Sequence, residues 1–233
     1  MSVITVFRQA GCKGRYIAES LAAALGYHFA DYATAERLMQ QCGYARTPEV
    51  YQSVPDFWDR FTRRGLERDE INNTLRSVTL AMARHGNVVM LGRGCYAPLQ
   101  GLSDVINVRL KAPLSLRIER VMRDLRLTPE EAAAFVEEKD VLVADFARTS
   151  YGLSPDDLSL FDIVIDTGRA DPDSVVGFLV EVVSAQAADG GEERPSAAAL
   201  EVDPVIASVV SDEFERVARL RTSAIEADAQ ESI

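Results

Sequence analysis

The sequence predicts an α/β fold, in which a parallel sheet carries helices on both faces and a helical extension follows. Short runs rich in Val and Ile alternate with longer helical patterns over residues 3–183, and this alternation is typical of strands joined by crossover helices. The chain has 233 residues, of which 47% are hydrophobic and 26% are charged. That length and composition suit one globular domain with an appendage.

Charge and composition exclude several classes of protein. The chain carries 36 acidic and 25 basic residues, and its net charge of -11 would repel a polyanion, so we expect no nucleic-acid partner. Cys12, Cys42 and Cys95 form neither a disulfide framework nor a metal-binding CxxC pair. No uncharged run approaches the ~20 residues of a membrane span, and no signal peptide precedes the first strand. We therefore predict a cytoplasmic protein without a membrane partner.

The N-terminal third begins with a strand and a helix. Residues 3–7 are apolar and β-branched, and residues 16–25 carry apolar side chains every four positions. Gly26 follows at the position where helices commonly end. Residues 27–29 predict a second, short strand, and residues 34–85 are mostly helical in pattern.

The remaining elements continue the alternation. The helix start at 128–130 has proline in its first turn and acids near the positive end of the helix dipole. The predicted strands span 87–91, 104–110 and 161–165, and the predicted helices span 113–126, the segment from 129 onward, and 172–183.

The C-terminal part changes in composition. Residues 184–203 are rich in Ala, Gly, Pro and acids without an apolar period, which predicts a linker. Residues 204–228 predict a helix whose apolar face runs from Val205 to Leu220. This helix either packs on the domain or joins two copies in a homodimer, and a regulatory tail is the alternative.

The turn between the first strand and the first helix, RQAGCKGR at 8–15, carries the strongest chemical signal. In a phosphate-binding loop of pattern GxxxxGK[ST], backbone N–H groups and a lysine surround the phosphates. Aligned on the following helix, Arg8 and Lys13 replace the two glycines, Gly14 replaces the lysine and Arg15 replaces the hydroxyl. Taken alone, the segment fits an ordinary strand-turn-helix equally well.

Later segments resemble the cytidylate-kinase-like family of P-loop NTPases, which are relatives of the nucleoside monophosphate kinases. The resemblance covers residues 3–183 and keeps the order and spacing of its blocks. Those blocks are GRGCYAPL (92–99), VINVRLKAPLSLRIERVM (105–122), LTPEEAA (127–133), KDVLVADFARTSYG (139–152) and FDIVIDTGRADPDSVV (161–176).

The resemblance assigns roles to the loop and to the segments around it. Family members often open with SRxxGSGG, so Gly14 is a family trait, whereas Lys13 departs from the family's usual glycine. The family further implies an acceptor-binding insert at 34–85, a lid at 114–152, and ATP as the phosphate donor. The residues expected at the ATP phosphates are Arg8, Gly11, Cys12, Lys13, Gly14 and Arg15.

The same resemblance implies a set of catalytic cations. Arg93, between two glycines after a buried strand, would meet the acceptor's phosphate, although a strand-end arginine can also pair with a carboxylate. Arg117, Arg120 and Arg123 recur every third residue and so share an arc of about 120° on the lid helix. They would close on the transferring phosphate, or they form a solvated face paired with acids such as Glu119.

A third block supplies the remaining catalytic and acceptor-binding candidates. Asp145 and Arg148 lie three residues apart on one side of a helix, where the acid would orient a nucleotide and the arginine would meet phosphate, although a surface ion pair explains them equally well. Lys139 stands where the kinases have arginine and would bind the acceptor without bidentate geometry.

Magnesium ligands are less evident than cations. Leu91 and Gly94 occupy the positions at which related kinases carry an acid, and Arg15 replaces the usual hydroxyl. We therefore predict no protein metal ligand and expect Mg²⁺ to be held mainly by the nucleotide phosphates. Cys12 and Cys95 would lie near those phosphates, where we expect positive neighbours to lower the pKa of the thiols, which leaves redox sensing open.

Together these features predict transfer of the ATP γ-phosphoryl group to a nucleoside monophosphate, CMP or a similar nucleotide. The alternative is a nucleotide-sensing protein that keeps the fold and has lost the chemistry. A purely structural dimerisation protein is the third possibility.

Overall fold

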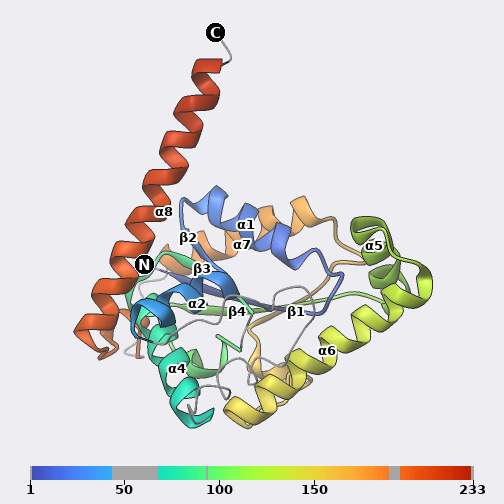
Figure 1. The fold of residues 1–233 in the computed structure, drawn as a ribbon, viewed down its shortest axis with the longest axis horizontal. Coiled ribbons are helices and arrows are strands. Elements are labelled where there is room, and N and C mark those ends of the chain that lie inside the picture. Colours follow the sequence, from blue (N-terminus) through green and yellow to red (C-terminus); the bar gives the residue numbers. More distant parts are fainter. Residues whose placement is uncertain (1, 44–67, 93, 189–194, 232–233) are drawn as a thin grey trace.

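The computed structural model describes the chain except for residues 1, 44–67, 93, 189–194 and 232–233, and it gives the backbone alone for 68–69, 187–188 and 221–231 (Figure 1). The described residues form a five-stranded parallel sheet in the order β2-β3-β1-β4-β5. The predicted fold class is confirmed. The strands are β1 Val3–Arg8, β2 His28–Ala30, β3 Val88–Leu91, β4 Val105–Lys111 and β5 Ile163–Asp166.

The inner strands β3, β1 and β4 carry apolar side chains on both faces, which suits their place in the middle of the sheet. β1 lies between β3 and β4, with Val6 in register with Leu91 on one side and Val108 on the other. All three of these side chains are buried, as expected for a parallel sheet covered on both faces. The carboxyl ends of β1 and β3 are therefore neighbours, which places Arg8 beside Gly92.

Helices cover both faces of the sheet (Figure 1). One face packs against α1 and α7, and the opposite face packs against α2, α4 and α8. α5 and α6 pack on each other beside the end of the sheet. The helices are α1 Gly14–Leu25, α2 Tyr32–Gln41, α4 Arg68–His85, α5 Leu114–Leu125, α6 Pro129–Tyr151, α7 Pro172–Ala188 and α8 Pro204–Glu231, with short 3₁₀ segments η1 Ala97–Leu99, η2 Leu158–Leu160 and η3 Ala197–Ala199.

Two predicted helix ends have the expected capping chemistry. α1 ends at Gly26 with φ 67, the left-handed conformation that glycine adopts without strain. α6 begins with a capping box, in which Thr128 and the Glu131 side chain bond to each other's backbone N–H. The predicted insert at 34–85 contains the greater part of α2 and all of α4, and its middle lies outside the described residues.

The linker prediction is wrong at both of its described ends. Residues 184–188 continue α7, because SAQAA is composed of good helix formers and lacks a breaker. After the undescribed stretch, Pro195 accepts a backbone hydrogen bond from Ser103 (2.8 Å), and Ala197 is completely buried. This segment packs against the domain, and it therefore brings the start of α8 to the domain surface.

α8 packs on the domain, as one of the predicted alternatives required. Val210 and Phe214 are buried, and the Phe214 ring stacks on His28 at 4.4 Å and meets His85 edge-on at 5.0 Å. The apolar face predicted from Val205 to Leu220 is buried only in its middle, because Val205 is 67% exposed and Leu220 is 57% exposed. The homodimer stays a prediction. In the part of the chain that the structure describes, no helix has the length and apolarity that a membrane crossing requires.

Candidate functional site

The turn between β1 and α1 leaves the first turn of α1 open at its N-terminus. Lys13 is the N-cap of α1, and its side chain makes no capping hydrogen bond to the helix. The first N–H groups of a helix have no intrahelical acceptor, and they carry the positive end of the helix dipole. The site is therefore suited to an anion.

Gly11 permits the turn to pack tightly against α5. Its φ is 78, and an added Cβ would lie 2.6 Å from the Arg117 backbone oxygen and 2.9 Å from its Cα. Any other residue would be strained and would collide with the backbone of α5. The loop's place against α5 thus depends on this glycine.

Lys13 shows why the resembling family favours glycine at its position. Its φ of 58 places a residue with a Cβ in the left-handed region, which costs roughly 1–2 kcal/mol relative to the right-handed helix. The Lys13 ammonium lies 2.7 Å from the Asp124 carboxylate on α5. The predicted phosphate-binding charge of Lys13 is therefore already paired.

Arg8 differs from the other cations of the loop. An added Cβ at Gly14 would lie 2.6 Å from Arg8 Cγ, and one at Gly92 would lie 2.9 Å from Arg8 Nη1, so the side chain crosses from β1 to the end of β3. Burial lowers the pKa of its guanidinium. Within the described part of the chain, no carboxylate forms an ion pair with Arg8. A half-buried cation without a counterion is a candidate partner for phosphate.

Arg117 holds the loop in place. Its guanidinium lies 2.7 Å from Asp140 on α6 and donates to the Ala10 carbonyl (3.2 Å), while the Asp140 carboxylate accepts the Ala10 N–H (2.9 Å). Arg117 is only 6% exposed. The pair therefore clamps both backbone groups of Ala10, and contact of Nη1 with phosphate would require exchange of these partners.

Arg120 is also turned toward the domain. It donates to the Gly11 carbonyl (3.3 Å) and to the Thr167 carbonyl (2.7 Å). Arg123, in contrast, has an exposed side chain 3.6 Å from Asp124. The solvated-face alternative is therefore wrong for Arg117, and the three arginines do not share one environment. Arg117 and Arg120 each donate to a carbonyl of the loop, and helical spacing alone does not reveal these partners.

Arg15 joins the phosphate loop to the end of β2. Its guanidinium lies 2.9 Å from Asp31 and 2.9 Å from Glu19. Burial acts to raise the pKa of Asp31, but hydrogen bonds from Thr34 and Arg15 outweigh it and lower that pKa. The sequence analysis did not single out Asp31. Its position directly after the short strand β2 was a usable signal, because ligands of parallel sheets bind at the carboxyl ends of the strands.

A protein-held magnesium centre does not fit the described residues. None of their His, Cys, Asp and Glu side chains gather in groups of three or more that could hold a metal. The two Asp31 oxygens already accept bonds from Arg15 and Thr34. The expectation that Mg²⁺ is held mainly by the nucleotide phosphates stays a prediction.

The remaining predicted residues lie on α6 or outside the described chain. Asp145 and Arg148 form an ion pair of 3.1 Å, with side chains 59% and 53% exposed. The Lys139 ammonium lies 5.3 Å from the centre of the Phe135 ring. Arg93 is not among the described residues. The surface pair predicted as an alternative is present, and the roles of all four residues stay predictions.

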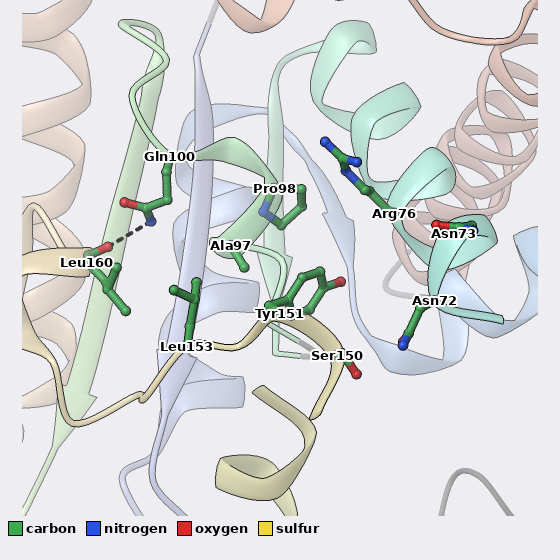
Figure 2. A pocket seen from close by; sticks show the side chains of 10 residues that line it. All are labelled: Asn72, Asn73, Arg76, Ala97, Pro98, Gln100, Ser150, Tyr151, Leu153 and Leu160. Atoms are coloured by element: carbon green, nitrogen blue, oxygen red, sulfur yellow. Dashed lines mark hydrogen bonds between the residues drawn. The ribbon is translucent and has the colours of Figure 1, made fainter. Parts of the chain in front are cut away.

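A pocket of about 430 Å³ opens between α4 and the end of α6 (Figure 2). Three buried polar atoms of its lining residues find no hydrogen-bond partner among the described residues, namely Asn72 Oδ1, Ser150 Oγ and Tyr151 OH. Leaving such groups unpaired costs about 1–3 kcal/mol each, so the pocket suits a polar ligand. The residues that line it are Asn72, Asn73, Arg76, Ala97, Pro98, Gln100, Ser150, Tyr151, Leu153 and Leu160.

Cys12 and Cys95 behave as core residues. Burial raises the pKa of the Cys12 thiol to about 11 and that of the Cys95 thiol to about 12. The expectation that positive neighbours lower these pKa values is wrong, because desolvation outweighs the attraction of Arg117 and Arg8. Redox sensing by these thiols loses its basis.

Comparison with known proteins gives one consistent family. The sequence profile described as "Cytidylate kinase-like family" matches residues 3–169. A cytidylate kinase of Ignicoccus hospitalis is 27% identical over 76% of this chain and 95% of its own length. One of Haloarcula marismortui is 26% identical over 82% of this chain and 94% of its own. An uncharacterized protein from Eubacterium ventriosum shares the fold, with a TM-score of 0.61, 16% identity and coverage of 79% and 98% of the two chains.

Replacing Gly11 tests the contact between the loop and α5. Gly11→Ala should weaken ATP binding by at least about tenfold, or 1.4 kcal/mol, because the new methyl group would push the loop away from Arg117. Gly101→Ala is the matched control, since Gly101 also has φ 78 but has open space around it. Calorimetric titration of both variants measures the difference. Equal affinities would show that the collision with α5 is harmless.

Thiol labelling tests the assignment of Cys12 and Cys95 to the core. At pH 8 the half-buried Cys42 should react with a thiol reagent well before the other two, whose neutral form is favoured by burial. The raised pKa values mean that the unfolded state releases protons first, so stability should fall as the pH rises from 9 through 11. Fast labelling of Cys12 in the folded protein would contradict this placement.

Proposed function

We propose, from the premise that this chain belongs to the cytidylate kinase-like family, that it binds ATP and transfers the γ-phosphoryl group to CMP or a closely similar nucleoside monophosphate. Its broader class is that of a nucleotide-binding phosphotransferase. In the reaction an oxygen of the acceptor's phosphate forms a bond to the γ-phosphorus, and the bond from that phosphorus to the β,γ-bridging oxygen breaks. The products are ADP and a nucleoside diphosphate.

The observation that carries the proposal is the uncapped start of α1 with Arg8 across it. Phosphoryl transfer requires little covalent help and depends on holding two polyanions in line while their charge is neutralised. Open N–H groups and an arginine that forms no ion pair with any described residue, both at the carboxyl edge of the sheet, provide such an environment. Arg8 is assigned to the ATP phosphates.

The other charged residues of the site fall into two groups, those that position the loop and those assigned to the phosphates and the acceptor. Arg117 and Arg120 act as positioning residues, since each bonds a carbonyl of the loop. Arg93, Lys139 and Arg148 keep their assignment to the acceptor and the transferring phosphate, with Asp145 orienting Arg148. Bound Mg²⁺ would lower the charge of the ATP phosphates, and the described residues contain no group of three or more His, Cys, Asp or Glu side chains that could hold the ion.

The acceptor is assigned to the pocket between α4 and α6. Buried atoms of Asn72, Ser150 and Tyr151 make no hydrogen bond to any other described residue, and Arg76 adds a positive charge. A pyrimidine nucleotide presents matching carbonyl, amino and phosphate groups. The relatives that match most of this chain carry the name cytidylate kinase, which favours CMP among such nucleotides.

A nucleotide sensor without turnover is the second candidate. Two features favour it: the charges of Lys13 and Arg15 are already paired with carboxylates, and the described residues offer no metal centre. Such a protein would bind ATP and release it unchanged.

A phosphotransfer assay separates the two candidates. The full chain mixed with ATP, Mg²⁺ and each nucleoside monophosphate in turn should produce diphosphates, fastest with CMP. Stabilisation of the protein against heat by ATP, together with a complete absence of products from every acceptor, would establish the sensor instead.

Substitution of Arg8 tests the site itself. Arg8→Gln should lower ATP affinity by about tenfold or more, because it removes the cation that lies across the start of α1. It should leave the melting temperature unchanged or raised, since a desolvated charge is lost with it. Arg123→Gln is the control, as it removes an exposed arginine of α5 from outside the loop. Unchanged ATP affinity in Arg8→Gln would remove this residue from the site.

A further inference from the structure

α8 is connected to the phosphate loop although it lies beyond the matched residues 3–169. A line of side chains runs from α8 through α2 to the first turn of α1. We propose that α8 positions the start of α1 through this line, with Glu213 as the positioning residue. The inference rests on the proposed function for its effect on ATP, but the line itself is defined by contacts that need no nucleotide.

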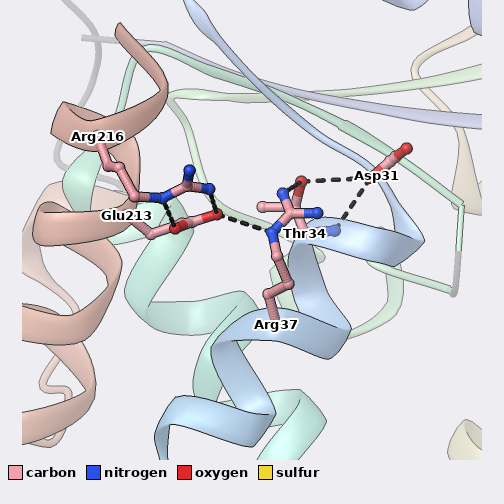
Figure 3. Close-up of polar contacts among 5 residues, drawn as sticks. All are labelled: Asp31, Thr34, Arg37, Glu213 and Arg216. Atoms are coloured by element: carbon pink, nitrogen blue, oxygen red, sulfur yellow. Dashed lines mark hydrogen bonds and ion pairs between the residues drawn. The ribbon is translucent and has the colours of Figure 1, made fainter. Parts of the chain in front are cut away.

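Glu213 is the point at which α8 enters the line (Figure 3). Its side chain is 1% exposed and lies between two arginines, with Arg37 Nε 2.9 Å from Oε1 and Arg216 Nε 2.8 Å from Oε2. Arg216 comes from α8 itself, whereas Arg37 comes from α2. A carboxylate buried to this degree needs both partners, so docking of α8 fixes the Arg37 guanidinium.

Thr34 connects Arg37 with Asp31 through its hydroxyl group (Figure 3). Arg37 Nη2 donates to Thr34 Oγ1 (3.1 Å), and the same hydroxyl donates to Asp31 Oδ1 (3.2 Å). A guanidinium is only a donor and a carboxylate only an acceptor, so the hydroxyl has one possible orientation between them. Thr34 is 5% exposed, which leaves little opportunity for water to replace either bond.

Asp31 completes the line to the phosphate loop. Its Oδ1 accepts the Thr34 backbone N–H (3.0 Å), which caps α2, and its Oδ2 lies 2.9 Å from Arg15 Nη1. Arg15 is the second residue of α1 and also pairs with Glu19. The carboxylate thus connects the cap of α2 with the first turn of α1, whose N–H groups are assigned to phosphate.

The line predicts how α8 affects the site. With α8 docked, Arg37 holds the Thr34 hydroxyl, Asp31 is held in one rotamer, and Arg15 is fixed to it. Without Glu213, Arg37 gains freedom and the Asp31–Arg15 pair loosens. The start of α1 is then less ordered before ATP binds, and ordering it weakens the affinity.

The test uses substitutions at the two ends and in the middle of the line in the full chain. Glu213→Gln and Thr34→Val should each raise the dissociation constant for ATP by about threefold to tenfold. The dissociation constant of the double variant should be no higher than that of the single variant with the larger effect. Thr34→Val removes the hydroxyl while leaving the Glu213–Arg37 pair intact, so it separates the line from simple undocking of α8. Thr34→Ser keeps the hydroxyl and Glu215→Gln removes an exposed acid of α8, and both should bind ATP as the unchanged chain does.

A second readout requires no nucleotide. Hydrogen exchange at the Thr34 amide, which bonds to Asp31, should accelerate by about threefold or more in Glu213→Gln but not in Glu215→Gln. If this exchange and the ATP affinity are both unchanged in Glu213→Gln, the inference is overturned. If the unchanged chain fails to bind ATP, the proposed function fails, and faster exchange at Thr34 still supports the line. Additive effects of Glu213→Gln and Thr34→Val on ATP affinity would also overturn it, because they would act through separate routes.

Discussion

The close packing of the β1–α1 turn against α5 is the constraint on which the site depends. Gly11 leaves no room for a Cβ beside the Arg117 backbone, and the Arg117–Asp140 pair binds the N–H and the carbonyl of Ala10. The Arg117 side chain of this pair is buried, whereas the Asp140 side chain is 28% exposed. The clash at Gly11 and the bonds to Ala10 together leave the turn little freedom to adopt another shape. α5 and α6, expected as a lid that brings cations to the phosphate, therefore also form the wall that shapes the loop.

The fold could be predicted from sequence because its signals are local and repeated. Apolar runs such as 87–91 and 104–110 are long enough to predict buried strands. Gly26 ends α1 and Thr128 begins α6 by chemistry that depends on near neighbours. The prediction of a linker failed because the placement of that segment depends on contacts that are distant in the sequence. The burial of Ala197 is decided by contacts with residues about 90 positions away, such as Asp104, and composition does not encode those.

The site was harder to predict because sequence gives the positions of charges but not their partners. Spacing on α5 suggested one basic face, yet Arg117 and Arg120 bond loop carbonyls that no periodic pattern marks. Lys13 and Arg15 are expected at phosphate, and in the structure they form ion pairs with Asp124 and Asp31. The residue pattern singled out the loop, and the family resemblance assigned it to phosphate, which stays a prediction. The resemblance could not distinguish a cation that is paired within the chain from one, such as Arg8, that has no counterion among the described residues.

The distinction between paired and unpaired cations also explains how an acidic chain can hold a polyanion. A net charge of -11 opposes nucleotide binding at long range, but that field is screened over about 8–10 Å in physiological salt. What acts at the loop is local: a half-buried guanidinium, the open end of α1, and carboxylates already occupied by other arginines. Asp31, Asp124 and Asp140 each carry a basic partner. Their charges are therefore largely cancelled before a phosphate arrives, and the unbalanced charge that remains at the turn is positive.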